Sequence, residues 1–354
     1  MQCVTPMIRS YSIYDSSDQR ILPRTYVAKQ LMKNPNWIRE QVEESNRISE
    51  QKGSKWRVQL IPCKHCYACQ LNYSSEWATR CMLEAQEHKH NYFITLTYDD
   101  EHLPVQETIT DPKSGKKYQN DGTWSGSLEP EHVKQFLNSL RKYFERKGIK
   151  GIKYFYCGEY GEKTQRPHYH MLLFGAPLDI TQFYDCHIDE INKKDHWKSK
   201  ELEHFWKRGM IDIGELEWSS AAYTARYCMK KLFQKDKSEY YKIGKKPEFV
   251  RMSRRPGIGM KYFEDHTIDL YENDELIMRT VKGNVGRYKP PKAFDNKFKD
   301  LYPEEWERIK ANRQNAADRG RYSKERLTDM SDSEMLQNSY EKVLTKANML
   351  PREL

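Results

Sequence analysis

Runs of apolar and β-branched residues in the middle of the chain predict a set of short strands. The segment NYFITLTYDD (91–100) is a compact apolar run closed by two acids, as expected for a buried strand. Three further runs are bounded by glycine or proline and predict strands as well. They are IKYFYCGEYG (152–161), RPHYHMLLFG (166–175) and RGMIDIGEL (208–216).

Helical spacing of apolar residues predicts helices around these strands. The clearest is SLEPEHVKQFLNSLRKYFERKG (127–148), in which apolar residues recur every three or four positions and Gly148 marks the end. The segments SSEWATRCMLEAQEHKH (74–90) and SSAAYTARYCMKKLFQK (219–235) begin with serines that can cap a helix. Residues 105–127 are rich in turn-forming and charged residues and predict an exposed loop or hairpin.

The order of these elements predicts an α+β fold. Short connections between the central strands favour an antiparallel sheet with helices on one side. We expect four regions along the chain. They are an N-terminal extension (1–60), polar and irregular except for a helix near 27–52, a cysteine-rich segment with a helix (61–90), a central domain (91–275), and a charged, largely helical C-terminal extension (276–354).

Composition and charge narrow the class of protein. The chain of 354 residues carries a net charge of +9. A basic surface favours an anionic partner, most often nucleic acid, although good solubility alone would also explain it. The sequence contains no run of about 18 apolar residues, and its N-terminus has no apolar signal region. We therefore expect neither a membrane span nor secretion.

Three of the eight cysteines are evenly spaced in PCKHCYACQ, at Cys63, Cys66 and Cys69. Two intervening residues let a turn point both thiolates inward, which is typical of a structural zinc site. Thiolates also bind iron–sulfur clusters, and cysteines without a metal are nearly as frequent, so these interpretations stay open. A tetrahedral zinc site needs a fourth ligand. The candidates in the sequence are Cys3, His65 and Cys81.

Two H-x-H patterns occur, and one of them places both imidazoles on the same face. His88 and His90 lie in or just after a predicted helix, where residues two apart point to different sides. His168 and His170 begin a predicted strand, where residues i and i+2 point to the same face. Two imidazoles on one face are a ready pair of metal ligands, although two hydrogen-bonded histidines would show the same spacing.

A carboxylate near His168 and His170 would complete a metal site. Glu159 ends the preceding strand and Glu162 lies in the turn, so either can return over the same sheet face. Two histidines and one carboxylate, with positions left open, suit Mg²⁺ or Mn²⁺ acting on a phosphate. An exposed turn is the commoner role of such glutamates.

The segment YTARYCMKK places two tyrosines on one face of a predicted helix. Tyr223 and Tyr227 are four residues apart, and Lys230 and Lys231 follow one turn later. An aromatic core stripe would give the same spacing, as in the second Y-x-x-x-Y pair at 156–160, but the lysines suit a surface that meets DNA. A phenol, whose ordinary pKa is near 10, becomes a workable nucleophile when a metal polarises the phosphate and a cation stabilises the phenolate.

Three of these blocks together resemble a known family. FITLTY, RPHYHMLLF and YTARYCMKK occur in the order found in HUH endonucleases, the initiators of rolling-circle replication. The Y-x-x-x-Y pair resembles the two-tyrosine class found in microviruses. PCKHCYACQ, LTYDDEHLP and MSRRPGIG are similar to blocks of replication-associated proteins from the gokushovirus branch, and the likeness covers about residues 61–263.

The resemblance implies a fold and a metal site. The fold would be a ferredoxin-like (RRM-like) antiparallel sheet with the metal site on its open face. His168 and His170 would be metal ligands, with Glu159 as the third ligand and Glu162 as the alternative. The family often has a bulky hydrophobic residue between the two histidines, where this chain has Tyr169.

The resemblance also implies a reaction. Tyr223 and Tyr227 would be the nucleophiles, with Lys230 as the lysine of a Y-x-x-K motif. One tyrosine would nick the origin strand of supercoiled replicative-form DNA and keep its 5′ end as a phosphotyrosine, leaving a 3′-OH for host polymerase. The second tyrosine would later cleave the regenerated origin, and rejoining would release a circular single strand. The implied cofactor is Mg²⁺ or Mn²⁺, the implied partners are origin DNA with a host helicase and DNA polymerase, and the implied location is the bacterial host cytoplasm.

Basic residues near the predicted tyrosine helix are candidates for DNA contacts. Lys231 lies at the end of the helix, and Arg254 and Arg255 lie in FVRMSRRPGIGMKYF, where Gly257 and Gly259 would let the backbone approach DNA. An ordinary basic loop would have the same composition. Two other functions stay open, namely a relaxase or transposase with the same chemistry and a non-catalytic, zinc-containing nucleic-acid-binding protein.

Overall fold

The computed structural model divides the chain into two compact units. One comprises residues 1–73 and 304–352, and the other comprises residues 74–303 and 353–354. The described residues are 7–12, 19–21, 35–63, 66–161, 163–188, 194–232, 238–279 and 285–330, with short helical pieces between 334 and 345. Some side chains in these ranges, including all those from 226 to 232, lie outside the description.

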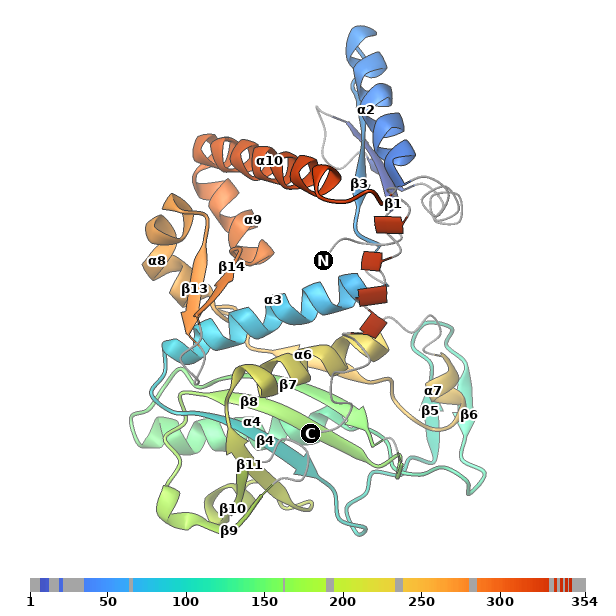
Figure 1. The fold of residues 1–354 in the computed structure, drawn as a ribbon. Coiled ribbons are helices and arrows are strands. Elements are labelled where there is room, and N and C mark those ends of the chain that lie inside the picture. Colours follow the sequence, from blue (N-terminus) through green and yellow to red (C-terminus); the bar gives the residue numbers. More distant parts are fainter. Residues whose placement is uncertain are drawn as a thin grey trace. The chain divides into compact units, whose positions relative to one another are not determined.

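The first unit contains a small sheet that the sequence did not predict. Strands β1 (Met7–Ser12), β2 (Gln19–Ile21) and β3 (Trp56–Ile61) pair antiparallel in the order β2-β1-β3 (Figure 1). Helices α2 (Pro35–Gln51) and α10 (Pro303–Arg326) belong to the same unit. The expected irregular extension is therefore wrong for these strands, whereas the helix expected near 27–52 is confirmed from residue 35 onward.

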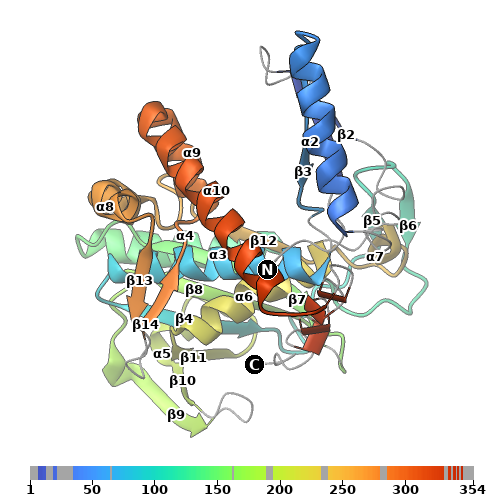
Figure 2. The same cartoon turned by 45° about the horizontal axis from the view of Figure 1, so that its top comes forward.

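The second unit is built on a fully antiparallel sheet. Its seven described strands follow the order β12-β7-β8-β4-β11-β10-β9, with β9 at one edge (Figure 2). The four predicted strands are confirmed as the middle of the sheet. The strands are β4 (Asn91–Thr97), β7 (Lys153–Tyr160), β8 (Pro167–Phe174), β9 (Phe183–Ile188), β10 (Asp195–Ser199), β11 (Ile211–Glu215) and β12 (Phe249–Met252).

Helices cover both faces of this sheet, so the prediction of helices on one side is wrong. Helix α4 (Pro130–Arg146) packs on one face, and α3 (Tyr67–Gln86) and α6 (Trp218–Leu232) run along the other (Figure 1). The physical reason lies in β8, where consecutive residues from Tyr169 to Phe174 are all buried. A strand that is apolar at successive positions must be covered on both sides.

Helix α4 forms as its sequence predicts. Glu129 caps the first turn by accepting a hydrogen bond from the Glu131 amide, and Pro130 occupies the first helical position. Gly148, at φ +80°, follows the last turn. The apolar residues of the helix point into the core between α4 and the sheet. They are Val133, Phe136, Leu137, Leu140 and Phe144.

The remaining elements surround the sheet or extend the second unit. The expected hairpin in 105–127 is confirmed by β5 (Thr108–Thr110) and β6 (Lys117–Gln119). Within the described ranges, every helix is too short or too polar to cross a membrane. The other elements are the 3-10 turn η1 (Ile180–Gln182), α5 (Lys200–Glu203), α7 (Ser238–Lys242), α8 (Met260–Glu272), β13 (Leu276–Arg279), β14 (Val285–Tyr288) and α9 (Lys292–Leu301).

Candidate active site

Strand register brings Glu159, His168 and His170 together on the face of the sheet that α6 covers. Glu159 of β7 is the direct register partner of His168 of β8, and His170 lies two residues further along β8. Glu159 Oε1 lies 2.9 Å from His168 Nε2 and 2.8 Å from His170 Nε2. One ligand atom from each residue lies within 4.8 Å of the others, so the three side chains can share one cation.

The other ring nitrogen of each histidine is held by a second group. His168 Nδ1 donates to the Arg166 carbonyl oxygen at 3.2 Å, and His170 Nδ1 lies 3.0 Å from Thr95 Oγ1. A proton on Nδ1 leaves the lone pair of Nε2 directed at the carboxylate. Partners of this kind orient histidines that bind metals.

Burial and charge at this triad also fit a cation. Glu159 and His170 are almost fully buried, and Glu159 Oε2 is a buried oxygen with no hydrogen-bond partner among the described residues. Burial alone would raise the pKa of Glu159, but the two imidazoles outweigh it and lower the pKa to about 2. Burial lowers the pKa of His170, whereas the pKa of His168 is raised because its hydrogen bond to Glu159 outweighs burial. An ionised carboxylate with an unsatisfied oxygen beside two imidazoles is a donor set that fits a divalent metal.

Tyr223 of α6 lies over the triad. Its ring meets His170 edge-to-face with centroids 5.2 Å apart, and its hydroxyl lies 3.4 Å from Glu159 Oε1. The ring is also part of the core beneath α6 and is 2% exposed. The expectation of a site on an open face is therefore wrong, because α6 closes over the ligands and buries this tyrosine with them.

Four further predicted site residues have positions only in part. The backbone of Tyr227, Lys230 and Lys231 continues α6, but their side chains lie outside the described part of the structure. Glu162 also lies outside the described residues. Glu159 is the carboxylate that the structure places against both histidines.

The other tyrosines of the motifs face the opposite core. Tyr156, Tyr160 and Tyr169 are buried between the sheet and α4. The Tyr169 hydroxyl accepts a hydrogen bond from the Glu129 amide at 2.7 Å and lies 3.0 Å from the Tyr98 hydroxyl. Because side chains alternate along a strand, the residue between the two histidines serves the core rather than the site.

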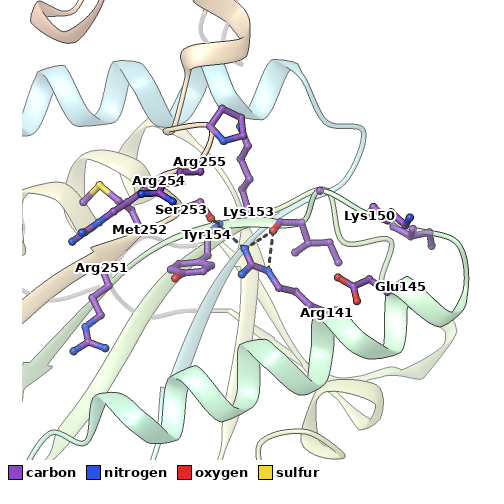
Figure 3. A pocket seen from close by; sticks show the side chains of 14 residues that line it. Arg141, Glu145, Lys150, Lys153, Tyr154, Arg251, Met252, Ser253, Arg254 and Arg255 are labelled. Carbon is purple, nitrogen blue, oxygen red and sulfur yellow. Dashed lines mark hydrogen bonds between the residues drawn. The ribbon is translucent and has the colours of Figure 1, made fainter.

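Arg254 and Arg255 are exposed and line a cavity of about 850 Å³ beside the edge strand β12 (Figure 3). Arg141 of α4 and Arg251 of β12 contribute further positive charge to its wall. The Arg141 guanidinium is already engaged, since it donates to the Ile152 carbonyl oxygen at 2.7 and 3.1 Å. The two exposed arginines are therefore the ones best placed to meet an anion from solvent.

Helix α3 holds the loop that carries these arginines. Arg80 donates twice to the Ile258 carbonyl oxygen, at 2.8 and 3.0 Å, and the Gly259 amide donates to Glu84 Oε2 at 2.7 Å. Gly259 has φ +75°, and a Cβ atom there would come within 3.0 Å of the Arg80 carbonyl oxygen. Gly259 therefore allows the loop to approach α3, which differs from the approach to DNA that we expected.

The three evenly spaced cysteines lie together in the first unit. One ligand atom from each of Cys63, Cys66 and Cys69 lies within 4.8 Å of the others, and the Cys63 and Cys69 sulfurs are 3.9 Å apart. This arrangement fits three ligands of a metal. Among the candidate fourth ligands, Cys3 and His65 lie outside the described residues, and Cys81 is buried in the core beside the sheet.

Comparisons with known proteins identify the family. Residues 91–232 match the ORF2 family of replication-associated proteins. The "Replication-associated protein ORF2" of Spiroplasma virus 4 is 38% identical over 297 residues, which cover 83% of this chain and 85% of that protein. The "Replication-associated protein VP4" of Bdellovibrio phage phiMH2K is 29% identical over 75% of this chain and 74% of its own length.

These matches agree in class, since both relatives are phage replication-associated proteins. The chain belongs to the microvirus-type family of replication-associated proteins, which confirms the resemblance drawn from its sequence. Among solved structures, the N-terminal nuclease domain of minute virus of mice non-structural protein-1 aligns with 62% of this chain and 89% of that domain. Its identity is 11% and its TM-score 0.18, which is too weak to carry an argument.

Proposed function

We propose that this protein initiates rolling-circle replication as a metal-dependent, site-specific DNA nickase and strand transferase. The observation that carries the proposal is the Tyr223 hydroxyl, 3.4 Å from a carboxylate oxygen that also contacts His168 and His170. A phenol beside a cluster of metal-binding side chains is the arrangement that transfer of a phosphoryl group to tyrosine requires. Membership of a phage replication-associated family supports the same function.

In this proposal Glu159, His168 and His170 hold the catalytic cation, Mg²⁺ or Mn²⁺. A bound divalent cation would polarise the scissile phosphate and offset its developing charge. The Tyr223 oxygen attacks the phosphorus and loses its proton, and a phosphotyrosine forms at the 5′ end. The bond to the 3′ oxygen breaks, and that oxygen takes up a proton to become a 3′-OH. The energy of the phosphodiester is kept in the new bond, so the step is reversible.

We further propose that Tyr223 acts first and Tyr227 second. Helix α6 continues through residue 227, which puts that position one turn beyond Tyr223 on the same side of the helix. A second nucleophile there can cleave the regenerated origin while the first product is still attached. The freed 3′-OH then attacks the first phosphotyrosine and closes a circular single strand. Lys230, one turn further, would stabilise the phenolate.

The proposed partners follow from the same reaction. Origin DNA would contact Lys231, Arg254 and Arg255, and a host DNA polymerase would extend the 3′-OH behind a host helicase. The reaction would take place in the cytoplasm of the bacterial host. Cys63, Cys66 and Cys69 would hold a structural Zn²⁺ in the first unit.

The test is covalent attachment of the protein to a nicked plasmid. Supercoiled plasmid carrying the phage origin is incubated with the protein and Mn²⁺ or Mg²⁺, and the 5′ end is probed for bound protein. We expect Tyr223→Phe to abolish the first adduct, and Tyr227→Phe to form it without releasing closed circles. Tyr302→Phe is the matched control, because Tyr302 is an exposed tyrosine outside the site. An adduct from the Tyr223→Phe/Tyr227→Phe double variant would refute the assignment, and the absence of any adduct with every divalent metal would favour a non-catalytic DNA-binding protein.

A further inference from the structure

We propose that His187, His196 and Asp212 form a second divalent cation site. The three residues come from neighbouring strands, β9, β10 and β11, at the end of the sheet that lies away from β7 and β12. One ligand atom from each lies within 4.8 Å of the other two. Sequence spacing gives no sign of this cluster, because up to 25 residues separate its members (212 − 187) and strand pairing alone unites them.

Each side chain directs a donor atom toward the same point. His196 Nδ1 forms a hydrogen bond with Asp212 Oδ2, and His187 Nε2 lies 3.4 Å from Asp212 Oδ1. The His187 Nδ1 donates to the Asp185 carbonyl oxygen at 3.0 Å, which leaves its Nε2 lone pair free for a metal. Asp212 Oδ1 is buried and makes no hydrogen bond within the described ranges. A cation would satisfy that oxygen.

A glycine allows the buried histidine to take this position. His196 is 3% exposed and lies over Gly214 of β11, its register partner. A Cβ atom at Gly214 would come within 2.7 Å of His196 Nε2, so any side chain there would displace the ring. With Nε2 placed against Gly214, Nδ1 is the nitrogen turned toward Asp212. The ring is therefore oriented by packing before any metal arrives.

The donor set indicates which cations the site would take. Two imidazoles and one carboxylate suit Zn²⁺ or Mn²⁺, whereas Mg²⁺ and Ca²⁺ prefer oxygen ligands. The side chain of His187 is 46% exposed, so the positions that the protein does not fill face solvent. A cation held here would join the edge strands β9 and β10 to β11.

This site is separate from the first one. Thr95 of β4 is the register partner of both His170 and Asp212, so one strand lies between the two clusters on the same face. At the usual strand spacing their backbones are about 10 Å apart. The Phe93 ring fills the space between them, stacked on His170 at 5.5 Å and edge-on to His196 at 6.4 Å. The inference does not depend on DNA cleavage.

The experiment counts bound metal. The full chain carrying Cys63→Ser, Cys66→Ser and Cys69→Ser, which removes the thiolates, is stripped of metal and dialysed against low micromolar Zn²⁺ and separately Mn²⁺. Bound metal is then measured by mass spectrometry. We expect two equivalents, one of which is lost in His168→Ala/His170→Ala. The other should be lost in Asp212→Asn, and also in His187→Ala, an exposed position where the change leaves the core intact.

A matched control and a second readout complete the test. His204→Ala removes another exposed histidine and should lose no metal. Zn²⁺ should slow amide exchange in β9 and β10 of the background protein and leave it unchanged in Asp212→Asn. If Asp212→Asn and His187→Ala keep the metal content of the background, or if His168→Ala/His170→Ala removes all of it, the second site does not exist. Loss of DNA nicking with both equivalents still bound would overturn the proposed function and leave this inference standing.

Discussion

The buried carboxylate of Glu84 should be one of the most sensitive positions for the stability of the second unit. Glu84 is 1% exposed at its side chain and lies 2.9 Å from Lys153 Nζ and 2.8 Å from His88 Nε2. It also accepts the amide of Gly259 at 2.7 Å. One side chain thus joins α3, β7 and the arginine loop. Replacing it with alanine leaves a buried lysine and a buried amide without this acceptor.

The magnitude of the Glu84→Ala effect follows from that loss. Breaking a buried ion pair by removing one partner costs about 3–5 kcal/mol. The effect can be measured at Cys157 of β7, which is 1% exposed and reacts with thiol reagents when the unit opens. In the regime where closing is faster than labelling, the Cys157 labelling rate should rise roughly 100- to 4,000-fold. Glu264→Gln, an exposed change on α8, should leave that rate nearly unaltered.

The pH dependence gives an independent check on Glu84. Burial would raise the pKa of Glu84, but hydrogen bonds from His88, Lys153 and the Gly259 amide outweigh it and hold the pKa below its ordinary value of 4.5. Such a carboxyl contributes stability above its unfolded-state pKa and loses it as the pH falls through the folded-state pKa. Acidification below about 4.5 should therefore speed Cys157 labelling less in Glu84→Gln than in the native chain. Additive costs for Glu84→Ala and Lys153→Ala in a double-mutant cycle would refute the reasoning, because coupled partners must deviate from additivity.

Three other changes test separate contacts. Tyr169→Phe leaves the buried Glu129 amide without its acceptor and should cost about 1–3 kcal/mol by the same thiol assay; native-like labelling would contradict the hydrogen bond. Gly259→Ala forces a side chain into φ +75° against α3 and should cost about 1–2 kcal/mol, so an equally stable variant would disprove the close approach. Arg254→Ala and Arg255→Ala should each weaken binding to single-stranded oligonucleotides of any sequence and reduce the salt slope by about 1. Fluorescence anisotropy across a salt series measures this, and an unchanged slope would place the DNA elsewhere.

The central strands and α4 could be predicted from the sequence because their apolar patterns are local and unbroken. The same pattern contained a signal that helices cover both faces, namely the consecutive apolar residues Met171 to Phe174, which serve two cores in turn. The edge strands were missed because β9 is exposed along almost its whole length and so has no apolar face to recognise. Strand β1 pairs with β3 across about 50 residues, which no local pattern reports.

The candidate site was predictable as far as strand geometry reaches. Spacing alone put His168 and His170 on one face, and the strand end pointed to Glu159. The contact between Tyr223 and Glu159 spans 64 residues and depends on how α6 packs, so local sequence could not place the hydroxyl. The role of Tyr169 followed from the alternation of side chains only once the partner at Glu129 was known.

All three ligands of the first site belong to one hairpin, within the twelve residues from Glu159 to His170. Strand β4, which pairs with β8, precedes them in the chain. During synthesis the ligands therefore leave the ribosome first, and Tyr223 follows about 50 residues later, roughly 3–10 s at ordinary rates of translation. A chain interrupted in that interval could hold a cation but carries no nucleophile. The order of the elements along the chain thus withholds reactivity toward DNA until the helix that supplies the tyrosine has been made and has docked.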